Sequence, residues 1–273
     1  MKQFTFLLLF LNFNFILFGQ IYISGTVNKM DNSVLPFVNI GIKSKNIGTL
    51  SDENGKFELT IPKQFSNDTL TFSYVGFEEL NIPLKTFLPG QKNIFTLKEK
   101  INFLEEVIVS NKKRKSIKIG TKTHNPFLSG SSESKDKNDI VEFAKFIEIN
   151  NKNSSIQSLS IFLVGLNIDT ATFRINFYDA KEGMPNKRII EKSIIQRSDI
   201  KKGWLTIDLS IYDIVLKNDF FVGFEFLPER KITKYSFSYG AQFGGNSVAR
   251  RSSLGKWEKQ KGAALSAYVT LKQ

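Results

Sequence analysis

The chain has 273 residues, 41% of them apolar and 13% aromatic, and carries a formal net charge of +12. This apolar content is enough for one large or two ordinary domains, and the 18 glycines and 7 prolines are too few for a disordered chain. Cysteine is absent, which excludes disulfides, thiolate chemistry and a lipid anchor on cysteine. The 26 phenylalanines favour strands, because aromatic side chains suit a pleated surface.

The first 19 residues have the pattern of a signal peptide. Lys2 gives a positive start, residues 4–18 are almost continuously Leu, Phe and Ile, and Gly19 is a small residue before a cleavage point at Gln20. The alternative is a membrane anchor, but about 15 apolar residues are fewer than the roughly 20 that a spanning helix needs. We therefore expect an exported protein of the periplasm, outer-membrane surface or extracellular space, without a transmembrane span after cleavage.

The net positive charge indicates which classes of partner an exported chain would bind. Cleavage removes the charge of Lys2 and leaves about +11, which suits an anionic glycan or lipopolysaccharide. Nucleic acid is the other common partner of basic chains, but exported proteins rarely meet it, so no nucleic-acid partner is expected. A solvated basic surface without any partner explains the same charge and stays open as the alternative.

Residues 21–97 alternate apolar and polar side chains in the manner of half-buried strands. The segment from Asp52 to Gly55 predicts a tight hairpin, because Asx residues tolerate the left-handed conformation and glycine readily adopts positive φ. The alternating apolar positions are Val38, Ile40 and Ile42, then Phe57, Leu59 and Ile61, then Leu70, Phe72 and Tyr74.

Five motifs follow one another in this region: ISGTV (23–27), LPFVNI (35–40), GT (48–49), SDENGKF (51–57) and YVGF (74–77). In this order they resemble the carboxypeptidase-regulatory-like (CarboxypepD_reg-like) domain. The resemblance implies a seven-stranded, prealbumin-like (immunoglobulin-like) β-sandwich over residues 20–110, with no active site of its own and with glycines in turns and bulges.

Domains of this family precede TonB-dependent glycan receptors and also occur in secreted and envelope proteins of Gram-negative bacteria. In a receptor, the domain continues into a plug and a long barrel. Only about 160 residues follow here, which is too few for such a barrel. We therefore do not expect this chain to be the receptor.

Residues 111–139 are expected to form a polar, basic linker. They contain the basic run KKRK (112–115) and end in a stretch rich in Ser, Lys and Asp (129–139). A solvated connector is the simpler interpretation, and electrostatic contact with an anionic envelope is the alternative. Residues 117–119 are a candidate first strand of the next domain.

Residues 140–273 contain a second series of short alternating stretches and predict an antiparallel, jelly-roll-like β-sandwich. Turns such as KEGMP (181–185) separate these stretches, and no long stretch has helical periodicity. A looser resemblance to jelly-roll modules of envelope proteins rests on FRINFY (173–178), GMP (183–185), GWLTIDL (203–209) and FVGFE (221–225). The predicted strands are 146–149, 159–163, 172–178, 189–195, 204–209, 220–227, 234–239 and 264–271.

The sequence offers little for catalysis. His124 is the single histidine and lies in the expected linker, so a Ser-His-Asp triad or a histidine metal site would depend on it. No phosphate-binding loop, zincin motif or nucleophile elbow occurs. Two carboxylates could hydrolyse a glycosidic bond, but acids in strands mostly face solvent, so we expect no enzyme, no cofactor and no metal. The acids available for such a pair are Glu142, Glu148, Asp169, Asp179, Asp208 and Glu225.

A ligand-binding surface is expected on the second sandwich, between Tyr239 and Trp257. Trp257, Tyr239 and Phe243 offer rings for stacking, and Arg250 and Arg251 offer planar donors for an anion. The segment around Phe243 and the two arginines is predicted to be a flexible, basic loop. The alternative is that Trp257 belongs to the core and the arginines to an ordinary surface.

Two other residue sets have competing interpretations. Trp204 begins a predicted strand after Gly203, where core packing is the commoner role and sugar stacking the alternative. Asp136, Asn138 and Asp139 supply clustered oxygens for a calcium ion, but their spacing lacks a calcium-loop signature.

Two classes of function therefore stay open for an exported envelope protein. The first is a non-catalytic binding or adhesion module for a glycan or another envelope component, and the second is a structural or assembly partner of an outer-membrane receptor complex. Glycoside hydrolysis ranks behind both. An exposed aromatic platform on the second sandwich would favour binding, and a bare sheet edge or apolar patch would favour assembly.

Overall fold

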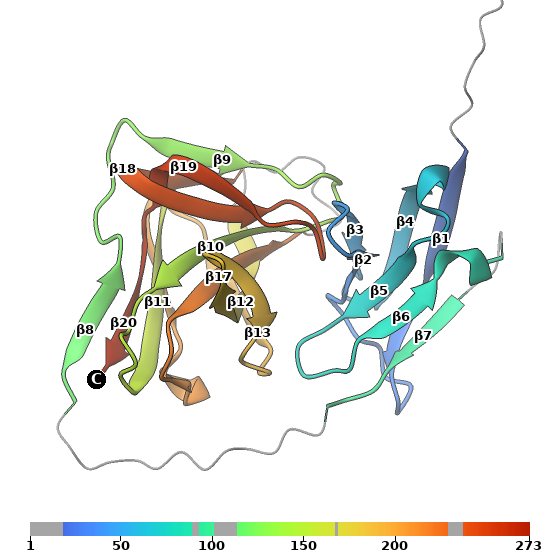
Figure 1. Cartoon of the computed structure of the whole chain (residues 1–273), viewed down its shortest axis with the longest axis horizontal. Coiled ribbons are helices and arrows are strands. Elements are labelled where there is room, and N and C mark those ends of the chain that lie inside the picture. The colour runs from blue at the N-terminus through green and yellow to red at the C-terminus, as the bar shows by residue number, and fades with distance from the viewer. Residues whose placement is uncertain (1–18, 89–92, 101–113, 167–168, 229–236) are drawn as a thin grey trace, which may run out of the picture.

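A computed structural model describes residues 19–88, 93–100, 114–166, 169–228 and 237–273 of the chain. These residues form two β-sandwiches that lie side by side (Figure 1). Helical structure in this described part is confined to the short 3-10 turns η1 (Lys63–Phe65), η2 (Leu84–Thr86) and η3 (Ser210–Tyr212). No helix within it is long and apolar enough to cross a membrane. The all-β fold is confirmed, whereas residues 1–18 of the expected signal peptide lie outside the described residues.

The N-terminal sandwich consists of a three-stranded sheet in the order β4-β1-β7 and a four-stranded sheet in the order β3-β2-β5-β6. Phe57, Phe72 and Phe95 fill the space between the sheets, and the ring centroids of Phe72 and Phe95 are 4.4 Å apart. The strands seen in the described residues confirm the seven-stranded sandwich. Their bounds are β1 (Gln20–Lys29), β2 (Asn39–Ile42), β3 (Ile47–Leu50), β4 (Lys56–Pro62), β5 (Thr69–Ser73), β6 (Leu80–Pro83) and β7 (Asn93–Leu97).

The predicted hairpin at Asp52 to Gly55 was wrong, although the turn itself forms. Asp52 Oδ1 accepts hydrogen bonds from the backbone N–H groups of Asn54 and Lys56, and Gly55 adopts a φ of +70°. This turn carries the chain from β3 in one sheet to β4 in the other, so its flanking strands do not pair with each other. The residue types of a turn indicate that the chain changes direction there. They do not indicate which sheet the next strand joins.

The C-terminal sandwich is, in its described residues, one continuous 13-stranded sheet whose two halves enclose a single core. One half contains β13-β12-β17-β10, the other contains β11-β20-β8, and β18 joins them by pairing with both β10 and β11. The bounds are β8 (Ser116–Gly120), β9 (Ser129–Ser132), β10 (Val141–Ile147), β11 (Ser154–Leu166), β12 (Thr170–Lys181), β13 (Met184–Arg188), β14 (Ile194–Asp199), β15 (Gly203–Asp208), β16 (Val215–Leu216), β17 (Phe220–Leu227), β18 (Phe237–Arg250), β19 (Glu258–Leu265) and β20 (Ala267–Lys272).

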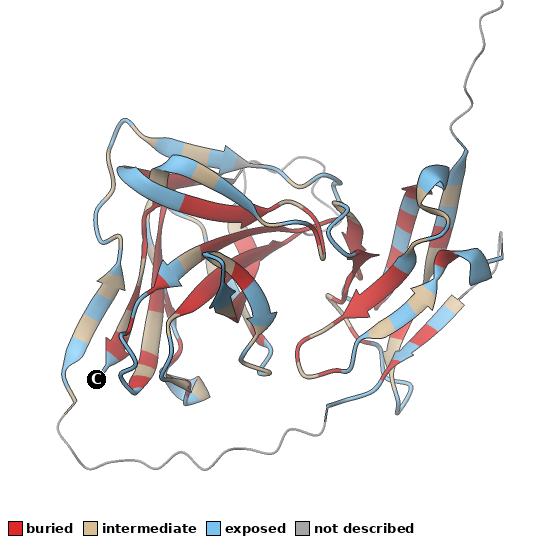
Figure 2. Cartoon of the chain, viewed as in Figure 1, coloured by how far each residue is buried: buried red, intermediate tan, exposed pale blue. Residues whose placement is uncertain are grey.

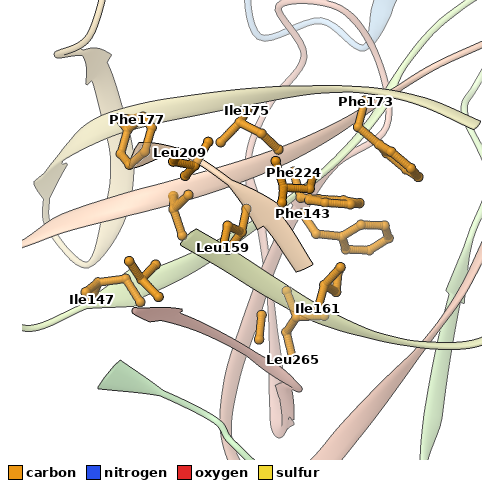
Figure 3. Packing of buried hydrophobic residues seen from close by; sticks show 14 of the residues in the cluster. Phe143, Ile147, Leu159, Ile161, Phe173, Ile175, Phe177, Leu209, Phe224 and Leu265 are labelled. Carbon is orange, nitrogen blue, oxygen red and sulfur yellow. The ribbon is translucent and has the colours of Figure 1, made fainter. Parts of the chain in front are cut away.

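The core of the C-terminal sandwich is built from apolar side chains of both halves. Phe143, Phe173 and Phe224 come from one half, and Leu159 and Ile161 come from the other (Figure 3). All of them are buried, and Figure 2 shows that the central strands carry most of the buried residues. Full burial of each such side chain stabilises the fold by about 1.5–3 kcal/mol, so this core is the main favourable contribution to the stability of the sandwich.

Two predictions about irregular segments were wrong. The expected linker contains β8 and β9, which pair with β20 and β18, although β8 confirms the candidate strand at residues 117–119. The expected flexible loop from Phe243 to Arg250 is part of the long strand β18, which pairs with β19. Gly244 and Gly245 adopt positive φ beside a shift in strand register next to Phe243. These glycines therefore belong to a β-bulge, which bends a strand without ending it.

Asp139 ties the start of β10 to the segment that follows β18. Its Oδ1 accepts hydrogen bonds from the backbone N–H groups of Ser253 and Ile140, each at 2.8 Å, and its Oδ2 accepts one from Ser252 Oγ at 2.6 Å. The carbonyl oxygen of Ser253 lies against Gly48 of the N-terminal sandwich, where a Cβ would come within 2.7 Å of it. Asp139 thus fixes a segment on which the N-terminal sandwich packs. Both carboxylate oxygens of Asp139, one of the three residues considered for calcium, accept hydrogen bonds from the protein.

Titration of Asp139 should make the stability of the fold depend on pH. Burial raises the pKa of this carboxyl from 3.8 to about 6, although hydrogen bonds from Ser252 and Ser253 oppose the rise. The folded chain therefore binds this proton more tightly than the unfolded chain, and the contribution of Asp139 to stability increases as the pH falls from 7 to 4.

We expect the free energy of unfolding of the wild type, relative to that of Asp139→Asn, to rise by up to about 3 kcal/mol over this interval. Denaturant unfolding of both proteins at pH 7, 6, 5 and 4 measures the difference. The asparagine side chain has a similar shape but does not titrate. Subtracting the free energy of unfolding of this variant therefore removes the contributions of all other titrating groups. A difference that stays constant with pH would contradict the expectation.

Candidate functional site

A row of four charged side chains crosses the half of the C-terminal sandwich that faces the N-terminal sandwich. Arg174 on β12 lies opposite Glu225 on β17 in the strand register. Glu142 on β10 lies opposite both Glu225 and Arg250 of β18. Because direct cross-strand partners share one face of a sheet, these residues form a continuous row, here called the charged row. Their exposure is 0% for three of them and 6% for Arg250.

Ion pairs and an amide hold the charged row together. Arg250 donates through Nε to Glu142 Oε2 at 2.7 Å, and its Nη2 lies 2.6 Å from the same oxygen. Arg174 Nη1 lies 3.5 Å from Glu225 Oε2. Between the two carboxylates, Asn176 Nδ2 donates to Glu142 Oε1 at 2.9 Å and to Glu225 Oε2 at 2.7 Å. One amide therefore bridges two like charges that would otherwise repel each other.

Neighbouring residues shape the space around Glu142. Tyr178 donates its hydroxyl to Glu142 Oε1 at 2.8 Å. Gly223 lies beneath the same oxygen, and a Cβ at that position would come within 2.2 Å of it. Trp257 covers the end of the row, with the guanidinium carbon of Arg250 4.8 Å from its ring centroid. Only glycine fits at position 223, so this residue is required by the buried carboxylate and not by a turn.

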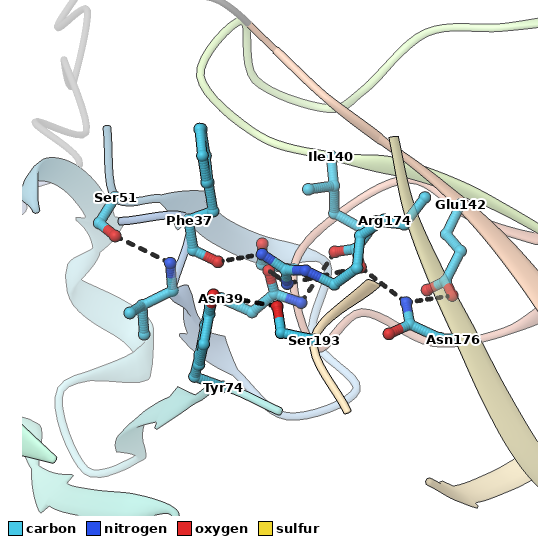
Figure 4. A network of polar contacts seen from close by, with 12 residues as sticks. Phe37, Asn39, Ser51, Tyr74, Ile140, Glu142, Arg174, Asn176 and Ser193 are labelled. Atoms are coloured by element: carbon cyan, nitrogen blue, oxygen red, sulfur yellow. Dashed lines mark hydrogen bonds and ion pairs between the residues drawn. The ribbon is translucent and has the colours of Figure 1, made fainter. Parts of the chain in front are cut away.

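The N-terminal sandwich completes the polar network (Figure 4). Asn39 on β2 donates its amide to Glu225 Oε1 at 2.9 Å, and Arg174 donates to the carbonyl oxygen of Phe37. The Arg174 guanidinium also lies 5.2 Å from the ring centroid of Tyr74. Asn39 occupies the polar side of a strand predicted to be half-buried, yet its exposure is 0% because the second sandwich covers it.

The two buried carboxylates differ in proton affinity. Burial raises the pKa of Glu142, and the charge of Arg250 only partly opposes this. Burial also acts on Glu225, but the charges of Arg174 and Arg250 hold its pKa below the usual range. Such a pair resembles an acid and a base, but neither side chain is accessible to solvent. A bound glycan could not contact them, so this network stabilises the junction and does not supply a glycosidase pair.

A second group of residues lies on the outer face of the other half of the C-terminal sandwich. Trp204 on β15 is opposite Phe162 on β11, and Tyr268 on β20 is opposite Ser160 of the same strand. Their neighbours along each strand, such as Leu159 and Ile161, point into the core. Strand alternation therefore places the aromatic rings outward. Trp204, Tyr268 and the hydroxyl or carboxylate side chains Ser158, Thr206, Asp208 and Thr270 are here called the aromatic face.

The rings of the aromatic face are held in fixed positions by one another. The ring centroid of Trp204 is 5.0 Å from that of Tyr268 and 5.4 Å from that of Phe162. His124 stacks on Phe162 with 3.6 Å between centroids, so this histidine supports the face and does not lie in a free linker. Lys118 Nζ lies 5.0 Å from the Tyr268 ring. Trp204 keeps 36% of its surface exposed, contrary to the assignment of this residue to the core.

The residues predicted to bind a ligand do not gather into one surface. Trp257 and Arg250 meet, but Arg250 is buried in its ion pair with Glu142. Tyr239 is 2% exposed, so it offers no ring face to a ligand. Phe243 is 70% exposed on β18.

Arg251 lies at a third place. Its carbonyl oxygen accepts a hydrogen bond from the backbone N–H of Lys135 at 2.8 Å, and its side chain lines a shallow hollow together with Glu133 and Lys135. The five predicted residues are therefore divided among a buried ion pair, the core and two separate surface positions. The anionic site expected from Arg250 and Arg251 acting together is not present as a single surface.

Removal of one arginine from the charged row should be costly. Arg174→Met leaves Glu225 charged, buried and without its ion pair, which costs about 3–5 kcal/mol in comparable cases. The matched control Arg197→Met, at an exposed arginine on β14, should change stability by less than about 1 kcal/mol. Urea unfolding at pH 7 measures both values. Similar losses in the two variants would contradict the structural role of the row.

The sequence profile of the CarboxypepD_reg-like domain family matches residues 23–109. Two TonB-dependent receptors of Formosa agariphila are similar to the chain: P39 is 34% identical over 93 residues, and P3 is 38% identical over 89 residues. The alignments take in 33% and 32% of this chain and 8% of each receptor, so the chain spans a small fraction of the length of these relatives.

Solved structures give only distant likenesses. The cysteine protease and lectin-like domains of Cwp84, a surface layer associated protein of Clostridium difficile, are 10% identical with a TM-score of 0.39, over 50% of this chain and 33% of that one. Another structure of this clostridial protease, after propeptide cleavage, is 9% identical with a TM-score of 0.42, over 87% and 66%. Neither likeness bears on function. The sequence matches, together with the seven-stranded sandwich, identify residues 23–109 as a CarboxypepD_reg-like domain.

Proposed function

We propose that this chain is a non-catalytic protein of the cell envelope that binds glycans on the aromatic face of its C-terminal sandwich. The observation that carries the proposal is the pair Trp204 and Tyr268, whose ring centroids are 5.0 Å apart on the outer face of a sheet. Aromatic rings with one apolar face exposed suit the apolar faces of sugar rings. The pair is preformed, so little side-chain entropy is lost when a ligand binds.

Polar side chains beside the rings support the same function. Thr206 and Asp208 follow Trp204 along β15 at every second position and are exposed. Ser160 and Thr206 share a hydrogen bond of 2.9 Å between their hydroxyls. Hydroxyl groups donate and accept, and a carboxylate accepts, so the face offers both kinds of partner to sugar hydroxyls. Rings flanked by such groups favour a glycan over a purely apolar ligand.

The envelope location is supported by two independent features. Residues 1–19 have the pattern of a signal peptide, and the relatives of the N-terminal sandwich are TonB-dependent receptors. In this arrangement the N-terminal sandwich is a rigid support that is locked to the binding sandwich by Asn39 and Tyr74. Assembly with an outer-membrane protein stays the alternative prediction.

Loss of the Trp204 ring should abolish most of the glycan affinity. Affinity electrophoresis in gels that contain laminarin, xylan or alginate tests two neutral polysaccharides and one acidic polysaccharide. We expect at least one of them to retard the wild type and the affinity of Trp204→Ala to be about tenfold weaker, a difference of about 1.4 kcal/mol. Phe243→Ala removes an aromatic ring from β18 that is more exposed than Trp204, 70% against 36%, and should leave the retardation unchanged.

Near-ultraviolet circular dichroism and thermal unfolding establish that both variants remain folded. A Trp204→Ala variant that is retarded like the wild type would refute binding at this face. Loss of retardation in Phe243→Ala alone would move the site to β18.

A further inference from the structure

A cavity of about 660 Å³ lies between the two sandwiches, beside the charged row. Side chains of both sandwiches form its wall, so the cavity exists only while the two are packed together. It lies on the junction side of the C-terminal sandwich and shares none of its lining residues with the aromatic face. Its wall includes Lys43, Tyr74 and Lys100 from the N-terminal sandwich and Tyr178, Arg188 and Arg250 from the C-terminal sandwich.

The buried and partly buried charges beside this cavity do not balance. Among the described residues at this place, three arginines meet two carboxylates. Glu225 pairs with Arg174 at 3.5 Å and Glu142 pairs with Arg250 at 2.6 Å. Arginine stays protonated in proteins, so one positive charge has no counter-charge even when both carboxylates are ionised. The third arginine is Arg188.

Arg188 carries the unpaired charge. It ends β13 opposite Tyr178, and this register places its side chain on the same face of the sheet as the charged row. Its Nε is buried and has no hydrogen-bond partner among the described residues. Buried polar groups in folded proteins nearly always have a partner, and an unpaired buried charge is costly. A partner supplied from solution would remove both costs.

Two other lysines on the cavity wall are already paired with carboxylates, and a third, Lys187, is exposed to solvent. Lys43 Nζ lies 2.6 Å from Glu79 Oε2, and Lys100 Nζ lies 2.5 Å from Glu191 Oε1. Glu191 Oε2 also accepts a hydrogen bond from the backbone N–H of Gly76 at 2.9 Å. These two carboxylates are therefore engaged at the rim of the cavity and are not available to neutralise the third arginine.

We propose that this cavity binds the carboxylate of a sugar acid, such as a hexuronate, and that Arg188 anchors it. The partly buried guanidinium of Arg188, which has no counter-charge, suits a monoanion, whereas a phosphate monoester carries nearly two charges at pH 7. The planar guanidinium offers parallel N–H donors that fit a carboxylate. The ring of Tyr74 in the wall suits the apolar face of a sugar. A volume of about 660 Å³ is within the range of small-molecule sites.

Titration calorimetry on the purified chain tests the ligand class and the anchoring residue. Sodium glucuronate, glucose 6-phosphate and glucose compare a carboxylate, a phosphate and a neutral sugar of similar size. We expect the wild type to bind glucuronate most tightly and Arg188→Gln to bind it at least tenfold more weakly. Arg188→Lys keeps the charge without the planar fork and should be intermediate. Arg251→Gln, the matched control outside the cavity, should keep wild-type affinity.

Thermal unfolding distinguishes a binding residue from a structural one. Because Arg188→Gln removes a partly buried charge that has no counter-charge, its Tm without ligand should equal or exceed that of the wild type, and glucuronate should raise only the wild-type Tm. A lower Tm of the variant without ligand would assign Arg188 a structural role and overturn the proposal. Equal glucuronate affinities of the two proteins, or preference for glucose 6-phosphate, would overturn it as well. Trp204→Ala should bind glucuronate normally, which separates this site from the aromatic face.

Discussion

The charged row is the constraint on which the packing of the two sandwiches depends. Four ionised groups in one row of a sheet cannot be removed from water unless they are paired, because each isolated buried charge costs several kcal/mol. Arg174 and Arg250 neutralise the outer ends of the row, and Asn176 bridges its centre. A further acceptor position on Glu225 is filled by Asn39 of the other sandwich. The C-terminal sandwich therefore needs the N-terminal one to complete its own electrostatics.

This dependence explains why the junction between the sandwiches is specific. Polar groups with fixed geometry accept one arrangement, whereas an apolar contact would tolerate sliding. Gly48 adds a steric condition, since a side chain at that position would collide with the carbonyl oxygen of Ser253. Asp139 fixes the position of that carbonyl group by accepting hydrogen bonds from Ser252 and Ser253. Hydrogen bonding and close backbone contact thus select the same orientation, and the cavity beside Arg188 follows from it.

The sequence predicted the positions of the strands far better than it predicted which parts of the protein pack against their faces. Alternation along residues 173–178 correctly indicated β12 and separated Phe173, Ile175 and Phe177 from Arg174, Asn176 and Tyr178. Polar alternate positions are normally expected to face water, and here they are buried because Arg174 packs against the N-terminal sandwich and Tyr178 packs against Trp257. The alternation of apolar and polar residues indicates which side chains share a face of a strand. It does not indicate which part of the protein packs against that face. The burial of Asn39 was unpredictable for the same reason.

The aromatic face was accessible to sequence reasoning, because the required signal lies within one strand. Trp204 alternates with Leu205 and Ile207, which enter the core, so it shares its face with Thr206 and Asp208. A tryptophan in register with polar residues is better interpreted as outward than as core. The cavity at Arg188 has no such signal, since its charge imbalance appears only when strands distant in sequence are aligned. Sites on one strand face can thus be inferred from alternation, whereas sites between sandwiches require the register of the whole sheet.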